Sequence, residues 1–117
     1  MITITKVLQQ VYVLKDRAGC CGNLVVGRRK ALLFDTGSGI DNMREALGTI
    51  TELPLIVINS HGHFDHIGGN CQFEQAYLPK LDIPILENYD GKTLNRWIRD
   101  LAKEHAWPYL ASRKDWA

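Results

Sequence analysis

Four consecutive apolar residues at positions 55–58, followed at once by the polar Asn59, constrain the fold of this chain more than any other feature. A continuous apolar run of this length is typical of a strand whose two faces are both covered. Residues 41–49 before it carry apolar side chains at helical spacing, and Asp41 is placed to cap that helix. With a further apolar strand at 31–34, the order strand, helix, strand predicts an α/β fold.

The first third of the chain has the pattern of a meander of strands. Apolar or β-branched runs at 2–6, 11–14, 24–26 and 31–34 are separated by Gly, Asn, Asp and charged residues. The basic cluster at 28–30 falls between two of these runs, which favours a solvated hairpin turn over a phosphate site. We expect these strands to form one sheet.

Composition limits the chain to one domain and excludes several kinds of partner. Its 117 residues, 45% hydrophobic and 23% charged, suit a single folded domain spanning residues 1–117. A formal net charge of +1 gives no reason to expect nucleic acid. The longest apolar stretch is far shorter than the roughly 20 residues of a membrane helix. The alternating N-terminus does not resemble a signal peptide, so we expect no membrane partner and a cytoplasmic location.

The three cysteines fit the same picture. Their odd number, and the direct neighbours Cys20 and Cys21, argue against a disulfide framework and favour a reducing compartment. Zinc sites built on cysteine usually space the thiolates as C-x-x-C, so we expect this pair to be small packed residues at the start of a strand. We also expect Cys71 to be buried packing rather than a ligand.

The chemistry of the chain is concentrated in residues 59–70, which read NSHGHFDHIGGN. His61 and His63 are two apart, so they point to the same side of an extended segment and can converge on one ion. Asp65 and His66 could give a carboxylate oxygen and a ring nitrogen to a second ion. Imidazole and carboxylate ligands without thiolate suit zinc, manganese or iron. The glycine pair that follows would let the backbone turn tightly without a Cβ clash.

This segment resembles the H-x-H-x-D-H metal-binding motif of the metallo-β-lactamase-like hydrolases. Residues 23–27, N-L-V-V-G, and 32–37, L-L-F-D-T-G, are similar to the hairpin and the D-T-G turn that precede the motif in that family. The resemblance covers about residues 10–75. It implies a four-layer αβ/βα sandwich with a metal site at one edge of its two sheets.

For the site, the resemblance implies that His61 and His63 hold one metal ion and that Asp65 and His66 hold a second. It implies that Asp35 supports the ligand loop from outside the coordination shell, and that Asp65 also orients the attacking water as a catalytic residue. Two zinc ions would lower the pKa of a bridging water toward neutrality and polarise the substrate. The implied activity is hydrolysis of an ester, thioester, lactam or similar bond in a small-molecule substrate.

The family pattern requires further ligands after the motif, and His105 is the only histidine there. It falls beside the apolar face of a helix that we expect between about residue 90 and Pro108, so packing is the better interpretation. The resemblance implies two βα halves, of which this chain holds one, so an apolar sheet face would be uncovered. We therefore expect a truncated or half form of the sandwich, which associates with itself or with a missing C-terminal half, or an inactive homologue.

Two alternatives stay open. The segment F-D-T-G-S at 34–38 is also similar to the catalytic turn of aspartic proteases, in which case Asp35 would share a proton with its counterpart in a homodimer. That hypothesis leaves the histidine cluster without a purpose. The other alternative is a non-catalytic metal-binding or interaction module.

Overall fold

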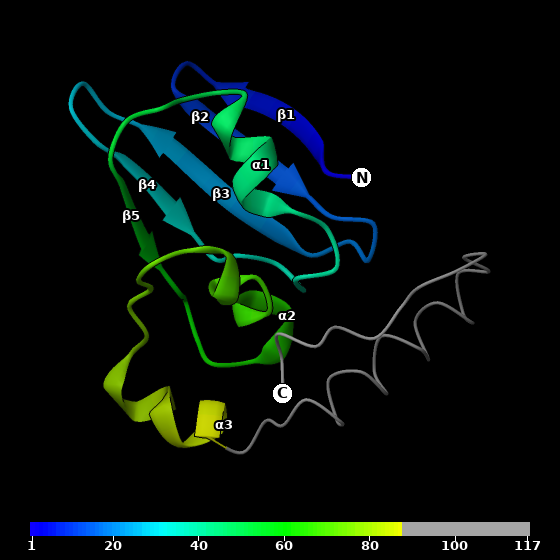
Figure 1. Ribbon diagram of the computed structural model, residues 1–117, viewed down its shortest axis with the longest axis vertical. Helices are drawn as coiled ribbons and strands as arrows, with labels where there is room; N and C mark the ends of the chain where they lie inside the picture. Colours follow the sequence, from blue (N-terminus) through cyan, green and yellow to red (C-terminus); the bar gives the residue numbers. More distant parts are fainter. Residues whose placement is uncertain (88–117) are drawn as a thin grey trace.

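The computed structural model describes residues 1–87, and they are built around one five-stranded sheet (Figure 1). Its strands lie in chain order: β1 (Thr3–Leu8), β2 (Val11–Lys15), β3 (Cys21–Val26), β4 (Ala31–Phe34) and β5 (Leu55–Ile58). The first four pair antiparallel, whereas β5 pairs parallel to β4. The predicted meander is confirmed, with an exposed turn at 28–30. The helix expected after residue 90, and His105 with it, lie outside the described residues.

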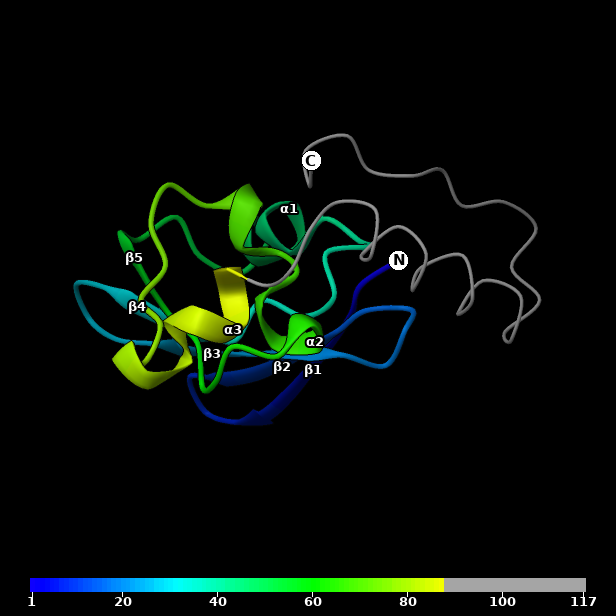
Figure 2. The ribbon, with the colours of Figure 1, turned by 90° about the horizontal axis from the view of Figure 1, so that it is seen from below.

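The helices are short and follow the strands. Helix α1 (Met43–Gly48) connects β4 to β5 and lies over one face of the sheet (Figures 1 and 2). After β5 come α2 (Phe64–Ile67), the 3-10 turns η1 (Asn70–Gln72) and η2 (Lys80–Asp82), and α3 (Ile83–Glu87). Among residues 1–87, none of the helices has the length and apolar character needed to cross a membrane. The core between α1 and the sheet consists of Leu14, Leu24, Ala31, Leu33, Met43, Leu47 and Val57.

The start of α1 differs from the sequence-based prediction. Asn42, not Asp41, caps the helix, because its side chain accepts a hydrogen bond from the Glu45 N–H at 3.0 Å. Asp41 is buried instead and accepts hydrogen bonds from the backbone and guanidinium of Arg17, at 2.9 and 2.6 Å. The charged partner on the β2–β3 turn therefore holds Asp41 one residue before the helix cap.

A second buried carboxylate ties the same two loops together. Asp16 accepts hydrogen bonds from Ala18 N and Cys20 N within its own turn. Its other oxygen accepts from both the backbone N–H and the hydroxyl of Ser38, at 2.9 and 2.6 Å. The turn between β2 and β3 thus fixes the loop that follows β4, and that loop carries part of the candidate site.

The face of the sheet opposite α1 is not covered by any described helix, and we call it the open face. Cross-strand partners lie on the same side of a sheet, so the pairing defines two rows of side chains across four strands. The rows are Val11, Val25, Leu32 and Ile56, and Val13, Asn23, Phe34 and Ile58. Ile56 is 38% exposed and Val25 43%. The expectation that both faces of β5 are covered is therefore wrong for residues 1–87, because only the α1 side is packed.

Candidate metal centre

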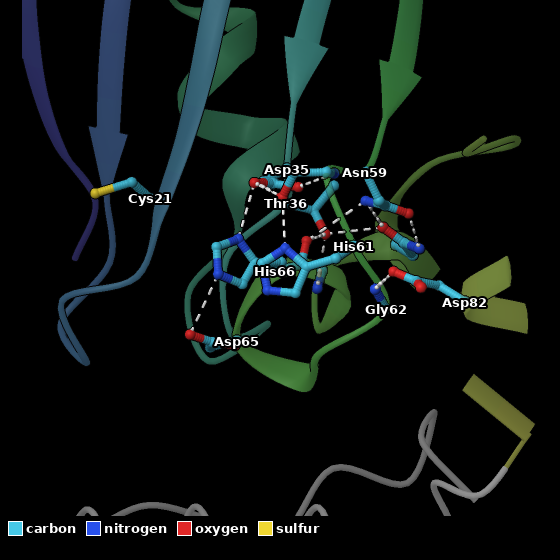
Figure 3. Close-up of polar contacts among 12 residues, drawn as sticks. Cys21, Asp35, Thr36, Asn59, His61, Gly62, Asp65, His66 and Asp82 are labelled. Atoms are coloured by element: carbon cyan, nitrogen blue, oxygen red, sulfur yellow. Dashed lines mark hydrogen bonds and ion pairs between the residues drawn. The ribbon is translucent and has the colours of Figure 1, made fainter. Parts of the chain in front are cut away.

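The candidate site lies at the edge of the sheet where β4 and β5 end (Figure 3). Because these two strands are parallel, their carboxyl ends meet, and the loops that leave them lie side by side. Asp35 follows β4 directly, and the loop from Asn59 leads from β5 into α2. The parallel pairing therefore explains how residues far apart in sequence reach one place.

Three potential ligands come together there. His61, Asp65 and His66 each offer an atom such that all three lie within 4.8 Å of one another. The Nε2 atom of His66 and Oδ2 of Asp65 are 3.4 Å apart. Zinc bonds of about 2.0–2.1 Å in a tetrahedron place neighbouring ligand atoms roughly 3.3 Å apart, so this pair matches the separation that zinc requires. The three side chains are grouped closely enough to form a candidate metal site.

His63 is placed differently from the other three motif residues. Its side chain is exposed, and its ring meets the ring of His61 edge to face, with centroids 4.8 Å apart. Residues 60–62 bend, and His63 is the N-cap of α2. The segment is therefore bent, whereas we expected it to be extended. The ring of His61 lies close to the rings of both His63 and His66, with centroids 4.8 and 4.0 Å away.

Asp35 holds His66 directly and His61 through Ser60. It is buried, and its backbone has a φ of 72°. Its Oδ1 accepts the Ser60 N–H at 2.7 Å, and its Oδ2 lies 2.7 Å from the Ser60 hydroxyl and 2.8 Å from His66 Nδ1. A carboxylate can only accept, so His66 donates through Nδ1–H, which leaves the lone pair of Nε2 available toward Asp65.

The same carboxylate sets the tautomer of His61 through Ser60. The single hydroxyl hydrogen of Ser60 goes to Asp35, so Ser60 Oγ acts as an acceptor toward His61 Nδ1 at 2.9 Å. His61 therefore also carries its hydrogen on Nδ1 and presents a bare Nε2. Both histidines have the protonation pattern that a metal ligand needs.

A buried polar network, which the sequence analysis did not include, supports the loop. Asn59 and Asn70 exchange side-chain hydrogen bonds at 2.8 and 3.0 Å. The Thr36 hydroxyl lies 2.9 Å from Asn70 Oδ1, and the backbone N–H of Thr36 donates to the His66 carbonyl at 2.9 Å. Asn59 and Thr36 are each 1% exposed. The signal that could have found Asn59 is a polar residue placed directly after an apolar strand.

Gly68 and Gly69 serve this site by allowing close approach. A Cβ on Gly68 would overlap the Ser38 carbonyl, and one on Gly69 would overlap the Thr36 carbonyl. Gly68 has a φ of −60° and Gly69 of −93°, which any residue can adopt. The two glycines lie in the turn between α2 and η1, as expected, and the Cβ clash that they avoid is with the loop after β4.

The cysteines lie around the site without joining the three-residue group. Cys71 is exposed, so the expectation that it is buried is wrong. It sits in η1, where the neighbouring Gln72 turns inward and accepts hydrogen bonds from the first N–H groups of α1. Burial, together with the negative charges of Asp16 and Asp65, raises the pKa of Cys20 to about 12. That thiol therefore stays protonated at neutral pH.

Comparison with known proteins agrees with this architecture. Residues 23–105 match the Metallo-beta-lactamase superfamily, and the chain belongs to that family. A metallo-beta-lactamase from Pontibacter korlensis is 27% identical, with a TM-score of 0.60 over 75% of this chain and 48% of that one. A metallo-beta-lactamase from Hirschia baltica is 16% identical, with a TM-score of 0.63 over 74% of this chain and 47% of that one. The fold is thus a partial metallo-beta-lactamase fold.

A curated relative is similar over the same region. The Homo sapiens protein "Acyl-coenzyme A thioesterase MBLAC2" is 28% identical over 89 residues, which is 66% of this chain and 32% of the relative. The chain therefore spans about a third of the length of the curated relatives it matches. The family assignment speaks against the aspartic-protease alternative. So does the geometry of Asp35, whose two carboxylate oxygens are both engaged in a buried site.

Proposed function

We propose that this chain contributes the metal site of a metal-dependent hydrolase, with His61, Asp65 and His66 as ligands of a zinc ion. The observation that carries the proposal is the convergence of their three ligand atoms within 4.8 Å. The hydrogen bonds from Asp35 and Ser60, which leave both histidine Nε2 atoms bare, support it. Manganese or iron suits the same donor set.

A zinc ion with three protein ligands and one open position supplies an activated water and polarises the bond to be cleaved. Around it, the side chain of Asp65 is 48% exposed, so its carboxylate can orient a water molecule and accept its proton. His66 keeps its proton on Nδ1, held by Asp35. We propose that the exposed His63 joins the metal site when it is loaded, beside His61, as the motif implies.

The substrate class that we propose first is an acyl thioester. The similar Homo sapiens relative is described as an acyl-coenzyme A thioesterase. Water attack on a thioester carbonyl needs the same polarisation and water activation as attack on an ester or a lactam. Esters and lactams are therefore the comparison substrates.

We further propose that the open face receives a second βα layer, the remaining half of the sandwich. Seven of the eight side chains in its two rows are apolar, and an apolar face of this extent is typical of an interface. The solved relatives are about twice as long as the part that this chain matches. Such a layer would also bring further ligands to the edge where β4 and β5 end.

Metal content of the purified chain tests the function. We expect stoichiometric zinc in the unmodified chain, its loss in His66→Ala, and weaker binding in His63→Ala. His105→Ala removes the one histidine outside the motif and is the matched control, which should keep its zinc. Equal metal in all four proteins would refute the site.

Turnover separates the enzyme from a non-catalytic module. The zinc-loaded chain, with and without a supplied C-terminal half from a relative, is assayed against an acyl thioester, an ester and a lactam. Hydrolysis that His66→Ala abolishes supports the proposal. Tight zinc binding without turnover of any substrate in either arrangement would favour the metal-binding module instead.

A further inference from the structure

The peptide between the two histidines at 61 and 63 is held by a residue far outside the motif. The backbone N–H of Gly62 donates to Oδ2 of Asp82 at 2.9 Å (Figure 3). Asp82 is the last residue of η2 and lies 20 positions after Gly62. Its own backbone N–H donates to the Pro79 carbonyl at 2.9 Å, which fixes the turn that presents the carboxylate.

The contact between the loop and this turn is also sterically tight. A Cβ on Gly62 would lie 2.9 Å from the Asp82 carbonyl oxygen and 3.2 Å from the Asp82 Cβ. Ile85, in the first turn of α3, would be 3.4 Å away. Gly62 is buried although both neighbouring histidines are more exposed. The segment at 82–85 therefore packs directly against the histidine loop at Gly62.

We propose that Asp82 is a positioning residue of the metal site, and this rests on the proposed function of His61, Asp65 and His66. Its carboxylate fixes the orientation of the peptide that joins His61 to Gly62. That peptide sets the direction in which the His61 side chain leaves the backbone, and it places His63 at the start of α2. Asp35 controls the rings through Ser60 and His66, whereas Asp82 controls the backbone that carries them.

This assignment explains two features that the metal ligands alone leave unexplained. The middle residue of the H-G-H sequence is glycine because the Asp82 backbone occupies the space of a side chain. The Gly62 N–H lies in a loop, outside the described helices and strands, and the Asp82 carboxylate accepts its hydrogen bond. A buried N–H without an acceptor is costly, so loss of Asp82 should let the loop rearrange.

Two variants of Asp82 distinguish its role as a hydrogen-bond acceptor from the effect of its negative charge. Asp82→Ala removes the acceptor, whereas Asp82→Asn keeps an amide oxygen in the same place. Leu81→Ala changes the adjacent side chain, which is 90% exposed, and is the matched control. Zinc affinity is measured by competition with a chromophoric chelator, and the visible spectrum of the cobalt-loaded chain reports ligand geometry.

We expect about 10- to 100-fold weaker zinc binding and altered cobalt bands in Asp82→Ala, by analogy with other residues that support metal ligands. Asp82→Asn should lie within about threefold of the unmodified chain, and Leu81→Ala should match it. Unchanged affinity and an unchanged cobalt spectrum in Asp82→Ala would overturn the proposal. If the unmodified chain binds no zinc, the proposed function fails instead.

A measurement without metal distinguishes failure of the Asp82 proposal from failure of the proposed metal site. Hydrogen exchange at the Gly62 amide of the metal-free chain should be slow in the unmodified protein and in Asp82→Asn, and at least tenfold faster in Asp82→Ala. Amides in the centre of β3 should not change, which excludes general unfolding. Equal exchange at Gly62 in all three proteins would show that Asp82 does not hold the loop.

Discussion

The Oδ2 atom of Asp35 lies 2.8 Å from Nδ1 of His66, although the two residues are 31 positions apart. This contact joins the end of β4 to α2 and places a buried negative charge behind a ring whose other nitrogen faces Asp65. A carboxylate in this position keeps the imidazole in one tautomer and one orientation.

Asp35→Asn should weaken zinc binding by about 10- to 100-fold. The amide has the size of the carboxylate and tolerates the left-handed backbone at this position, so the change leaves the loop in place. The amide has only one acceptor oxygen, so it cannot replace all the hydrogen bonds that the two carboxylate oxygens accept from Ser60 and His66. Affinity is measured by chelator competition. Asp41→Asn, a buried acid of the same loop without a contact to the motif, should bind zinc normally; equal loss in both variants would contradict the specific role.

Gly68→Ala should lower the free energy of unfolding by about 3 kcal/mol or more, because the new Cβ overlaps the Ser38 carbonyl. Gly48→Ala is the matched control. Nothing lies within 4 Å of a Cβ at that position in α1, so alanine should stabilise the chain by about 0.5–1 kcal/mol. Urea unfolding followed by circular dichroism measures both. Similar stability of the two variants would show that the close approach is not required.

The isolated chain should self-associate through its open face, because exposed apolar rows cross four strands. Ile56→Lys places a charge at the β5 end of one row and should shift the chain to a monomer at the same concentration. Leu81→Lys, at an exposed position outside the face, should leave association unchanged. Sedimentation velocity measures all three. A stable monomer of the unmodified chain would contradict the prediction.

Asp41 should make stability depend on pH at the acid end. Burial alone would raise its pKa, but the hydrogen bonds and charge of Arg17 and the N-terminal ammonium lower the pKa below its usual range. The carboxylate therefore stabilises the folded chain above about pH 4, and this contribution is lost as the pH falls through the lowered pKa.

The corresponding variant is Asp41→Asn, which should cost roughly 1 kcal/mol at pH 7, a modest figure because Arg17 is 38% exposed. The stability difference from the unmodified chain should shrink below about pH 4. Thermal unfolding between pH 7 and pH 3 measures it. A difference that stays constant over this range would show that the Asp41 charge contributes nothing.

Local sequence pattern predicts the strands of the sheet and the helix that connects β4 to β5. The apolar runs at 11–14, 24–26, 31–34 and 55–58 predict strands because alternation and turn residues act over a few positions. The same pattern places the helix cap one residue too early, at Asp41, since Asn42 and Asp41 are equally good caps locally. The distant Arg17 decides between them.

Local residue patterns were sufficient for the resemblance to the family, the residue types of the candidate ligands and the position of the strand that ends beside them. Folding of the chain brings His61 to Asp65 and His66, places Asp35 where it sets two tautomers, and joins Asp82 to Gly62. The motif residues are neighbours in the chain, so their chemistry is local and visible. Their orientation depends on hydrogen bonds and backbone contacts across 20 to 31 residues, which only the packing of β4, β5 and η2 brings within reach.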